Sequence, residues 1–267
     1  MTKKTFLSIV TVNFNNLKGL KHTIESVLNQ TWKEFEYLII DGGSTDGSSE
    51  LISEMSKSFV YYVSEPDNGI YNAMNKGLKV ANGEYIYFLN SGDYLADSFV
   101  LDKVIKEIEN QNFLTKRKDV YVGSTRQEGF KNLISPPGYI SLYSLFKSTL
   151  PHQGIFMPRE RALRFPFKEE YKIVADWIQC TEILREGIAD FRILKNTDII
   201  AINEPFGTCS ELNVKLEKNV YIEKHQNVFR RFEDYQSIRF KYDQIKNVAN
   251  ANFLNRILWK GMKFIAK

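Results

Sequence analysis

The chain has 267 residues, 43% hydrophobic and 25% charged, which is ordinary for a globular protein and allows a core that needs no disulfide. Its two cysteines and three histidines lie far apart in sequence, which argues against a disulfide framework or a zinc site and fits a reducing compartment. The net charge of +4 is uneven, because residues 214–267 carry 12 Lys+Arg against 5 Asp+Glu and the remainder carries 24 against 27. The acidic-leaning body argues against a nucleic-acid-binding core.

The first predicted element is the apolar run Phe6–Val12. Lys3 and Lys4 precede it in the manner of a signal peptide, but the run has only seven residues and ends at Asn13 with no small-residue cleavage site after it. We therefore interpret it as a buried strand. No stretch of the sequence approaches the roughly 18 apolar residues of a membrane-spanning helix.

Strand and helix patterns then alternate through the first ninety residues. The β-rich apolar runs are Phe6–Val12, Phe35–Ile40, Phe59–Val63 and Tyr85–Leu89. Apolar residues at helical spacing lie between them, in the segments Leu20–Leu28, Ser49–Lys57 and Ile70–Leu78. This alternation predicts an α/β fold with parallel strands joined by right-handed crossovers.

The rhythm changes after Asp93. The patterns predict a helix over Val100–Ile108, a strand over Val120–Gly123, loops with short elements over residues 124–155, and a helix over Val174–Leu184. Beyond Leu212 the sequence is polar with helical character. We therefore predict one α/β domain over residues 1–211 and a helical, basic extension over residues 212–267.

Carboxylates and amides follow each of the first four predicted strands. They are Asn13, Asp41, Asp67, and the pair Asn90 and Asp93. Ligands bind outside the carboxyl ends of the strands in open α/β sheets, so these side chains share the ligand-binding rim. The same residue types are ordinary in turns, but four such loops in succession favour a ligand site, because crowded carboxylates need a cation or hydrogen-bond donors.

Two common nucleotide-binding motifs are absent. Residues 42–47 have P-loop spacing, but Ser48 stands where a lysine is required. No Gly-x-Gly-x-x-Gly follows the first strand, which argues against an NAD-dependent oxidoreductase. Without a glycine loop to cradle phosphates, an acidic rim binds a diphosphate through a divalent cation.

Three segments together resemble the family 2 inverting glycosyltransferases of the GT-A fold. Residues 7–13 are similar to the family's opening strand, residues 39–47 to its second-strand signature, and residues 64–77 to a block found in bacterial colanic-acid, O-antigen and capsule enzymes. The resemblance implies a Rossmann-like, mostly parallel central sheet flanked by helices.

The resemblance also implies roles for single residues. Asp41 would bind the base with help from Thr11 and Asn13, and Asp67 and Asn90 would also face the nucleotide. The segment 90–93 occupies the place of the family's metal motif, with Asp93 as the only ionisable residue left there. That departure leaves water and the diphosphate to supply most ligands of the metal, Mg²⁺ or Mn²⁺.

Asp176 falls where the family keeps its catalytic base, and His152 and Gln153 match a pair that lines the donor or acceptor site. Other interpretations stay open. Asp176 is also a favourable first-turn acid for the helix that follows it, and His152 also suits a structural or solvated role. A further departure is Asn72, which stands where close relatives have Asp.

The function implied by the resemblance is a hexosyltransferase that moves a sugar from a nucleoside diphosphate donor, UDP, to a hydroxyl of a growing, lipid-linked surface polysaccharide. The alternative is a non-catalytic nucleotide-sugar or partner binder on the same scaffold. A basic amphipathic pattern at residues 254–267 favours peripheral contact with a membrane as much as packing on the domain. The expected location is the cytoplasm, or the inner face of the plasma membrane.

Overall fold

The computed structural model of the chain describes residues 5–187, 190–204 and 211–225. The chain divides into two compact units, Met1–Glu217 and Lys218–Lys267, and the fold described below is that of the first. The basic pattern at residues 254–267 lies outside the described residues, so the boundary after residue 211 and the membrane contact stay predictions. Within the described part of the chain, no helix combines the length and the apolar character needed to cross a bilayer.

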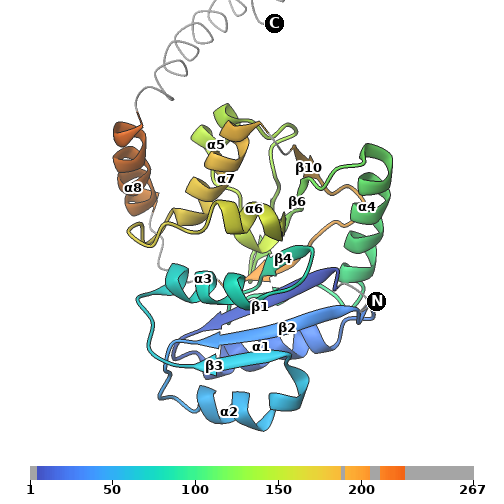
Figure 1. Ribbon diagram of the computed structural model, residues 1–267, viewed down its shortest axis with the longest axis vertical. Coiled ribbons are helices and arrows are strands. Elements are labelled where there is room, and N and C mark those ends of the chain that lie inside the picture. The colour runs from blue at the N-terminus through green and yellow to red at the C-terminus, as the bar shows by residue number, and fades with distance from the viewer. Residues whose placement is uncertain (1–4, 188–189, 205–210, 226–267) are drawn as a thin grey trace, which may run out of the picture. The chain divides into compact units, whose positions relative to one another are not determined.

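A seven-stranded sheet forms the centre of the first unit, in the order β10-β6-β9-β4-β1-β2-β3 (Figure 1). Its strands are β1 (Leu7–Asn13), β2 (Phe35–Asp41), β3 (Tyr61–Ser64), β4 (Tyr85–Phe88), β6 (Val120–Val122), β9 (Ile155–Pro158) and β10 (Phe191–Ile193). The pairs among β3, β2, β1 and β4 are parallel, and β9 runs antiparallel to both β4 and β6. The predicted α/β fold with a mostly parallel central sheet is confirmed.

Helices cover both faces of this sheet (Figure 1). They are α1 (Leu17–Leu28), α2 (Ser48–Glu54), α3 (Ile70–Val80), α4 (Val100–Thr115), α6 (Arg159–Arg164) and α7 (Ala175–Glu186). Apolar residues of α1, α2 and α4 form one buried cluster with alternate residues of β1, β2 and β4. Helix α3 packs on the opposite face, where a side chain at Gly77 would lie 2.5 Å from Val10, so the glycine permits close contact with the sheet.

A second sheet of four short strands was not predicted, and it matters for the site. Its order is β5 (Tyr94–Leu95), β11 (Ala201–Asn203), β7 (Thr125–Gln127) and β8 (Leu133–Ile134). Strands of two or three residues are too short to carry a periodic signal. Strand β11 pairs antiparallel with β5, so the end of β11 returns to the loop that carries Asp93.

The remaining elements differ from expectation mainly at their ends. The helix expected over Ser49–Lys57 ends at Glu54 and is followed by the 3₁₀ turn Ser56–Ser58. The loop region 124–155 contains the short helix α5 (Leu142–Lys147) and the 3₁₀ turn His152–Gly154, and the chain ends its described part in α8 (Glu211–Lys224).

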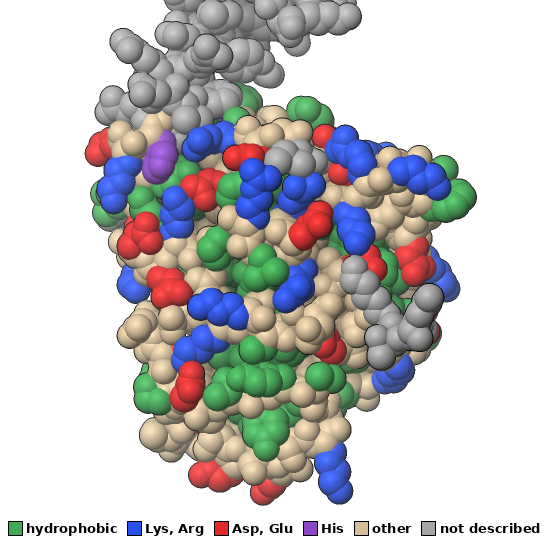
Figure 2. Space-filling model, viewed as in Figure 1, with side chains coloured by type: hydrophobic (Ala, Val, Ile, Leu, Met, Phe, Trp, Pro, Cys, Tyr) green, Lys and Arg blue, Asp and Glu red, His purple; other side chains and the backbone are tan. Residues whose placement is uncertain are grey.

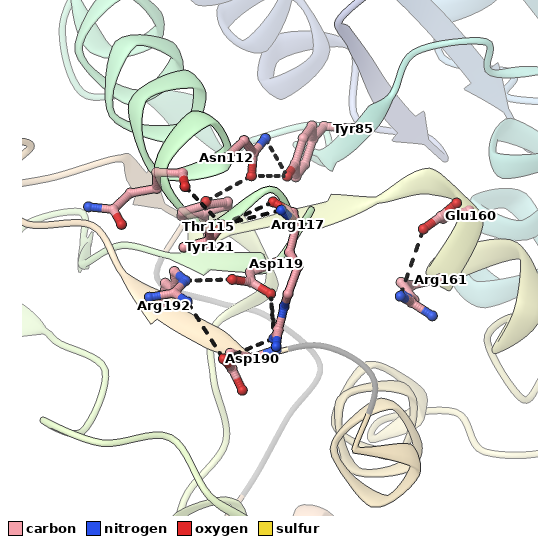
Figure 3. A network of polar contacts seen from close by, with 11 residues as sticks. Tyr85, Asn112, Thr115, Arg117, Asp119, Tyr121, Glu160, Arg161, Asp190 and Arg192 are labelled. Atoms are coloured by element: carbon pink, nitrogen blue, oxygen red, sulfur yellow. Dashed lines mark hydrogen bonds and ion pairs between the residues drawn. The ribbon is translucent and has the colours of Figure 1, made fainter.

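An ion-pair cluster around one buried carboxylate joins β6 to β10 (Figure 3). The carboxylate of Asp119, which is fully buried, accepts hydrogen bonds from Arg192 at 2.5 Å and Arg117 at 3.0 Å. Burial alone would raise the pKa of Asp119, but these hydrogen bonds outweigh it and hold the pKa below its ordinary value. Asp119 therefore stays ionised and fastens the edge of the sheet.

Side chains of both charges are interspersed over the face seen in Figure 2. A one-sided basic surface is what nucleic-acid binding requires, and this face does not present one. The exclusion of a nucleic-acid partner itself stays a prediction, since this view covers one face of the molecule.

Candidate functional site

Asp41, at the end of β2, is the centre of a saturated hydrogen-bond cluster. Its Oδ1 accepts from Asn13 Nδ2 at 2.7 Å and from the Ser44 hydroxyl at 2.6 Å. Its Oδ2 accepts from the Ser64 hydroxyl at 2.6 Å and from the Ser44 amide at 2.9 Å. A carboxylate has about four acceptor positions, so the chain itself fills all of them.

The charge of Asp41 follows from this cluster. Burial favours the protonated form, but the four hydrogen bonds outweigh burial and place the pKa of Asp41 below its ordinary value. Asp41 is therefore an anion at neutral pH. A ligand that binds this carboxylate has to replace one of the hydroxyl donors, Ser44 or Ser64.

The other residues predicted to bind the nucleotide beside Asp41 lie at different depths in the structure. Thr11 is fully buried beneath the rim, where its hydroxyl donates to the Leu89 carbonyl at 2.8 Å. Asp67 lies against Gly42, since a Cβ at that glycine would sit 2.6 Å from Asp67 Oδ2. The structure thus brings Asn13, Asp41 and Asp67 to one rim and leaves Thr11 below it.

Phe14 was missed by the sequence reasoning. Its ring also approaches Gly42, and 63% of the side chain is exposed. A large apolar ring exposed beside polar groups at a ligand rim is unusual, because such surface costs free energy unless something covers it. The signal available in the sequence was an aromatic residue directly after the strand end at Asn13.

Asp93 and Asn90, which follow β4, form a second part of the predicted site and lie close to His152 and Gln153. Gln153 Nε2 donates to Asp93 Oδ2 at 2.8 Å, and Asn90 Nδ2 lies 3.0 Å from His152 Nε2. The carboxyl end of β4 and the 3₁₀ turn at 152–154 therefore lie side by side. The Oδ1 atom of Asn90 is buried and has no hydrogen-bond partner within the described part of the chain.

Burial raises the pKa of Asp93 above its ordinary value, and the neighbouring His152 and the Gln153 hydrogen bond only partly offset this. The side chain is 7% exposed. Within the described residues, no lysine or arginine forms an ion pair with it. Asp93 is thus a buried carboxylate whose charge the described lysines and arginines do not neutralise.

Asp176 lies in the first turn of α7, and its two oxygens face different partners. Oδ1 accepts from the Trp177 amide at 2.8 Å and lies 3.2 Å from the Tyr71 hydroxyl, whose shorter bond, 2.7 Å, goes to the Ile173 carbonyl. Oδ2 lies 3.7 Å from His152 Nδ1. Its side chain is 18% exposed, so the carboxylate remains accessible to a ligand.

His152 connects the two acidic residues Asp176 and Asp93. Burial lowers its pKa, but the carboxylate of Asp176 and the charge of Asp93 outweigh burial, so the pKa of His152 lies above its ordinary value. Beside Asp176 and His152 lies a small pocket whose wall includes Ile86, Phe88, Phe167 and Cys180. Cys180 is a buried free cysteine there, and Cys209 lies outside the described residues.

Two glutamates escaped the sequence reasoning. Glu204, at the end of β11, donates its backbone N–H to Asp93 Oδ1 at 3.2 Å. Glu169 accepts from Asn72 at 2.8 Å and from Asn75 at 2.9 Å, which gives Asn72 a partner. Both glutamates lie about a hundred residues from their partners in sequence, where no local pattern could have shown them.

A divalent cation, as the resemblance implies, suits the donor set at Asp93. Mg²⁺ and Mn²⁺ prefer carboxylate and carbonyl oxygens, and the orphaned Asn90 Oδ1 is such an oxygen without a donor. The described residues hold no cluster of three or more His, Cys, Asp or Glu that would enclose a metal by itself. The protein would therefore supply few of the ligands, as in sites where Mg²⁺ binds through substrate phosphates and water.

Comparisons with known proteins give a family match and a shared fold. The family model "Glycosyl transferase family 2" matches residues 8–166. An uncharacterized glycosyltransferase of Mycobacterium tuberculosis is 32% identical over 158 residues, covering 58% of this chain and 60% of the relative. The chain therefore spans about three fifths of the length of the curated relatives that it matches first.

Two solved structures share the fold. S. aureus TarS 1–349 in complex with UDP-GlcNAc aligns with a TM-score of 0.62 and 16% identity over 76% of this chain and 60% of that chain. The mannosyltransferase PcManGT from Pyrobaculum calidifontis, in complex with GDP-Man and Mn²⁺, aligns with a TM-score of 0.56 and 15% identity over 76% of this chain and 57% of that chain. At such identities the likeness establishes the fold alone.

Proposed function

This chain belongs to glycosyltransferase family 2 and has the predicted GT-A fold, and we propose that it transfers a hexose from a UDP-sugar to an acceptor hydroxyl with inversion at the anomeric carbon. The observation that carries the proposal is the position of Asp176. Its carboxylate is accessible and lies one histidine away from the Asn90–Asp93 segment, where the diphosphate of the donor would be held.

The donor would bind along the rim from Asp41 to Asp93. In this proposal Asp41 accepts a hydrogen bond from the base in place of the Ser44 or Ser64 hydroxyl, and Phe14 stacks on the base. Asn13 and Asp67 border the same space. The nucleotide sugars bound to TarS and PcManGT support a donor of this class, and the choice of UDP follows the family resemblance.

Asp93 and the orphaned oxygen of Asn90 would hold a divalent cation on the donor diphosphate. The cation, when bound, offsets the negative charge that develops on the leaving diphosphate. Gln153 holds Asp93 Oδ2 in place through its amide. A rim that fixes the donor in this way contributes to the rate by orientation as well as by charge.

Asp176 would act as the general base. The acceptor oxygen forms a bond to the anomeric carbon as the bond from that carbon to the diphosphate oxygen breaks, and the acceptor proton passes to Asp176. His152 and the Trp177 amide orient the two oxygens of Asp176. Single displacement from the face opposite the leaving group gives inversion.

The acceptor proposed here is a lipid-linked oligosaccharide of a bacterial surface polysaccharide, as the block at residues 64–77 suggests by resemblance. Such an acceptor lies at the inner face of the plasma membrane, where the basic C-terminal stretch would meet anionic lipid. The same scaffold without turnover, as a nucleotide-sugar binder, is the alternative.

The substitution Asp176→Asn distinguishes the proposed transferase from the non-catalytic nucleotide-sugar binder. It keeps the size of the side chain but cannot accept a proton, and general-base assistance is worth about 10²–10⁴-fold. We expect normal UDP affinity and sugar transfer at least about a hundredfold slower. The measurement is the transfer rate with a panel of UDP-sugars and UDP affinity by calorimetry on the same preparation.

Glu186→Gln, on the same helix but paired with Arg164 at 2.8 Å, is the matched control and should transfer at the wild-type rate. A near-normal rate for Asp176→Asn would remove Asp176 from the mechanism. Wild-type protein that binds UDP-sugars and never transfers them, with any acceptor or with water, would favour the binder.

A further inference from the structure

Glu204 is brought to Asp93 by the second sheet. Strand β11 pairs with β5, and the residue that follows β11 donates its backbone N–H to Asp93 Oδ1 at 3.2 Å. The sequence separation is 111 residues. The metal motif thus gains a carboxylate that is absent from its own segment, 90–93.

The Glu204 side chain folds back over Gly92. A Cβ at Gly92 would lie 2.1 Å from Glu204 Oε2, so a side chain at this position would have to displace the Glu204 carboxylate. The backbone at Gly92 has φ +98, which also favours glycine. The described residues offer this oxygen one further contact, a long one of 3.4 Å to Asn16 Nδ2. The Glu204 carboxylate therefore lies over Gly92 on an exposed residue, and within the described residues it has one weak donor.

The groups around this space carry more negative than positive charge, and the base whose charge acts on Asp93 is His152. Asp93 and Glu204 are both acidic, the donors that reach them are amides, and the described residues provide neither with a lysine or arginine ion pair. Asn90, 8% exposed, adds an amide oxygen with no hydrogen-bond donor in the described structure. Like charges so placed are unfavourable unless a cation joins them, and all three groups are oxygen donors.

We propose that Glu204 is a second carboxylate ligand of the divalent cation that binds at Asp93. The proposal rests on the proposed function, which places the donor diphosphate there. It also answers the departure noted in the sequence: the motif with a single aspartate regains a second negative charge from a distant strand. Diphosphate oxygens and water complete the coordination, in the manner of Mg²⁺ sites.

Glu128 is a matched control on the same sheet edge. Strands β7 and β11 are parallel with Gln127 opposite Asn203, so Glu128 and Glu204 are corresponding residues just beyond the two strand ends. Glu128 differs in its contact, since its carboxylate accepts from the Tyr94 hydroxyl at 3.3 Å. Neutralising Glu128 tests whether any lost charge at this edge weakens metal binding.

The experiment measures Mn²⁺ binding directly, from the EPR signal of free Mn²⁺, with UDP present and absent. We expect Glu204→Gln to weaken Mn²⁺ binding at least about tenfold, since even outer-shell partners of a metal are worth about 10–100-fold in affinity. Glu128→Gln should stay within about twofold of wild type, and Glu204→Asp, which keeps the charge, should lose less than Glu204→Gln.

Two results would overturn the proposal, and they differ. Equal Mn²⁺ affinity of wild type and Glu204→Gln, with loss of affinity in Asp93→Asn, removes Glu204 from the site and leaves the proposed function standing. Wild-type protein that binds UDP with no affinity for Mn²⁺ or Mg²⁺ removes the metal itself, and Glu204 with it.

Discussion

Asp119 and Asp93 are buried carboxylates in the same domain with opposite surroundings. Asp119 is fully buried between Arg192 and Arg117, and its pKa is lowered (Figure 3). Asp93 is almost as buried, yet amides and a histidine are its near neighbours and its pKa is raised. The described residues pair one of these carboxylates with two arginines and give the other neither a lysine nor an arginine.

The difference separates a structural acid from a binding acid. An ion pair that the fold provides compensates the buried charge, so removing one partner destabilises the fold, and it leaves nothing for a ligand to do. A buried anion without a cation costs stability, and a fold retains such a cost where a ligand relieves it. Burial of a carboxylate therefore says little about its role until the charges around it are counted.

Among the variants that test this contrast, Asp93→Asn has the largest expected effect, and it should change activity and stability in opposite directions. Removing a group that stabilises transition-state charge typically costs about 10²–10³ in kcat. A raised pKa in the folded protein means that ionised Asp93 lowers stability as pH rises through that pKa, so the neutral amide should raise the Tm at pH 7. Transfer assays and thermal unfolding without metal measure the two effects.

The opposite signs are what make this test specific. A lower Tm for Asp93→Asn at pH 7 would mean that the chain compensates Asp93 after all, and the contrast with Asp119 would fail. Added Mg²⁺ should raise the Tm of wild type and leave that of the variant unchanged, because a ligand stabilises only the state that binds it.

Asp119→Asn should lower stability and leave donor binding unchanged, which is the reverse of the pattern expected for Asp93→Asn. Hydrogen bonds to charged groups contribute about 1.5–3 kcal/mol, so losing the bonds from Arg192 and Arg117 should lower the free energy of unfolding by about 2–3 kcal/mol. UDP affinity should be unchanged, since the cluster lies on β6 and β10. Urea unfolding and calorimetry provide the two numbers.

The pH dependence gives this prediction its own control. The folded pKa of Asp119 lies below the unfolded one, so its stabilisation is present above about pH 4 and is lost as pH falls through the folded pKa. Wild type should lose more stability than Asp119→Asn as the pH falls below about 4, and the two curves should converge in acid. Parallel curves would show that Asp119 is not the group responsible.

The same contrast explains what the sequence could predict. The Asp41 cluster was predictable because its partners are local or lie on neighbouring strands: Ser44 is three residues away, and Asn13 and Ser64 stand opposite Asp41 in the parallel register. Parallel strands that end together bring their loops together, and a period-two pattern shows where they end.

The part of the proposed site formed by Asp93, Asp176 and His152 was predicted only through family resemblance. Asp93 and Asp176 meet through His152, and Glu204 arrives on a strand of three residues. Neither the 3₁₀ turn at residues 152–154 nor β11 has a periodic hydrophobic pattern. Reasoning from sequence spacing therefore could not have placed them together. The strands β9 and β11, which carry this half of the site, are among the strands that the patterns did not show.

Glu169 has surroundings intermediate between those of Asp119 and Asp93. Like Asp93, it is held by amides, Asn75 and Asn72, but its pKa is lowered by those hydrogen bonds. It is also less buried and has no orphaned oxygen beside it among the buried polar atoms of the described residues. Amide donors therefore suffice for a carboxylate near water, whereas they do not offset burial at Asp93.

Asn72→Asp should have the smallest effect of the set. It replaces the amide that donates to Glu169 Oε2 with a second carboxylate, so the hydrogen bond is lost and two like charges face each other, at a cost of about 1 kcal/mol in the free energy of unfolding. The loss should shrink below about pH 4, where carboxylates protonate. Because Glu169 lies seven residues before Asp176, a few-fold fall in transfer rate with unchanged UDP affinity is expected.

Asn72→Ala, which removes the donor without adding charge, should lose the hydrogen bond but show no such recovery in acid. Equal pH profiles for the two variants would mean that the carboxylate introduced at position 72 turns to solvent, and that an amide at this position matters only as a donor.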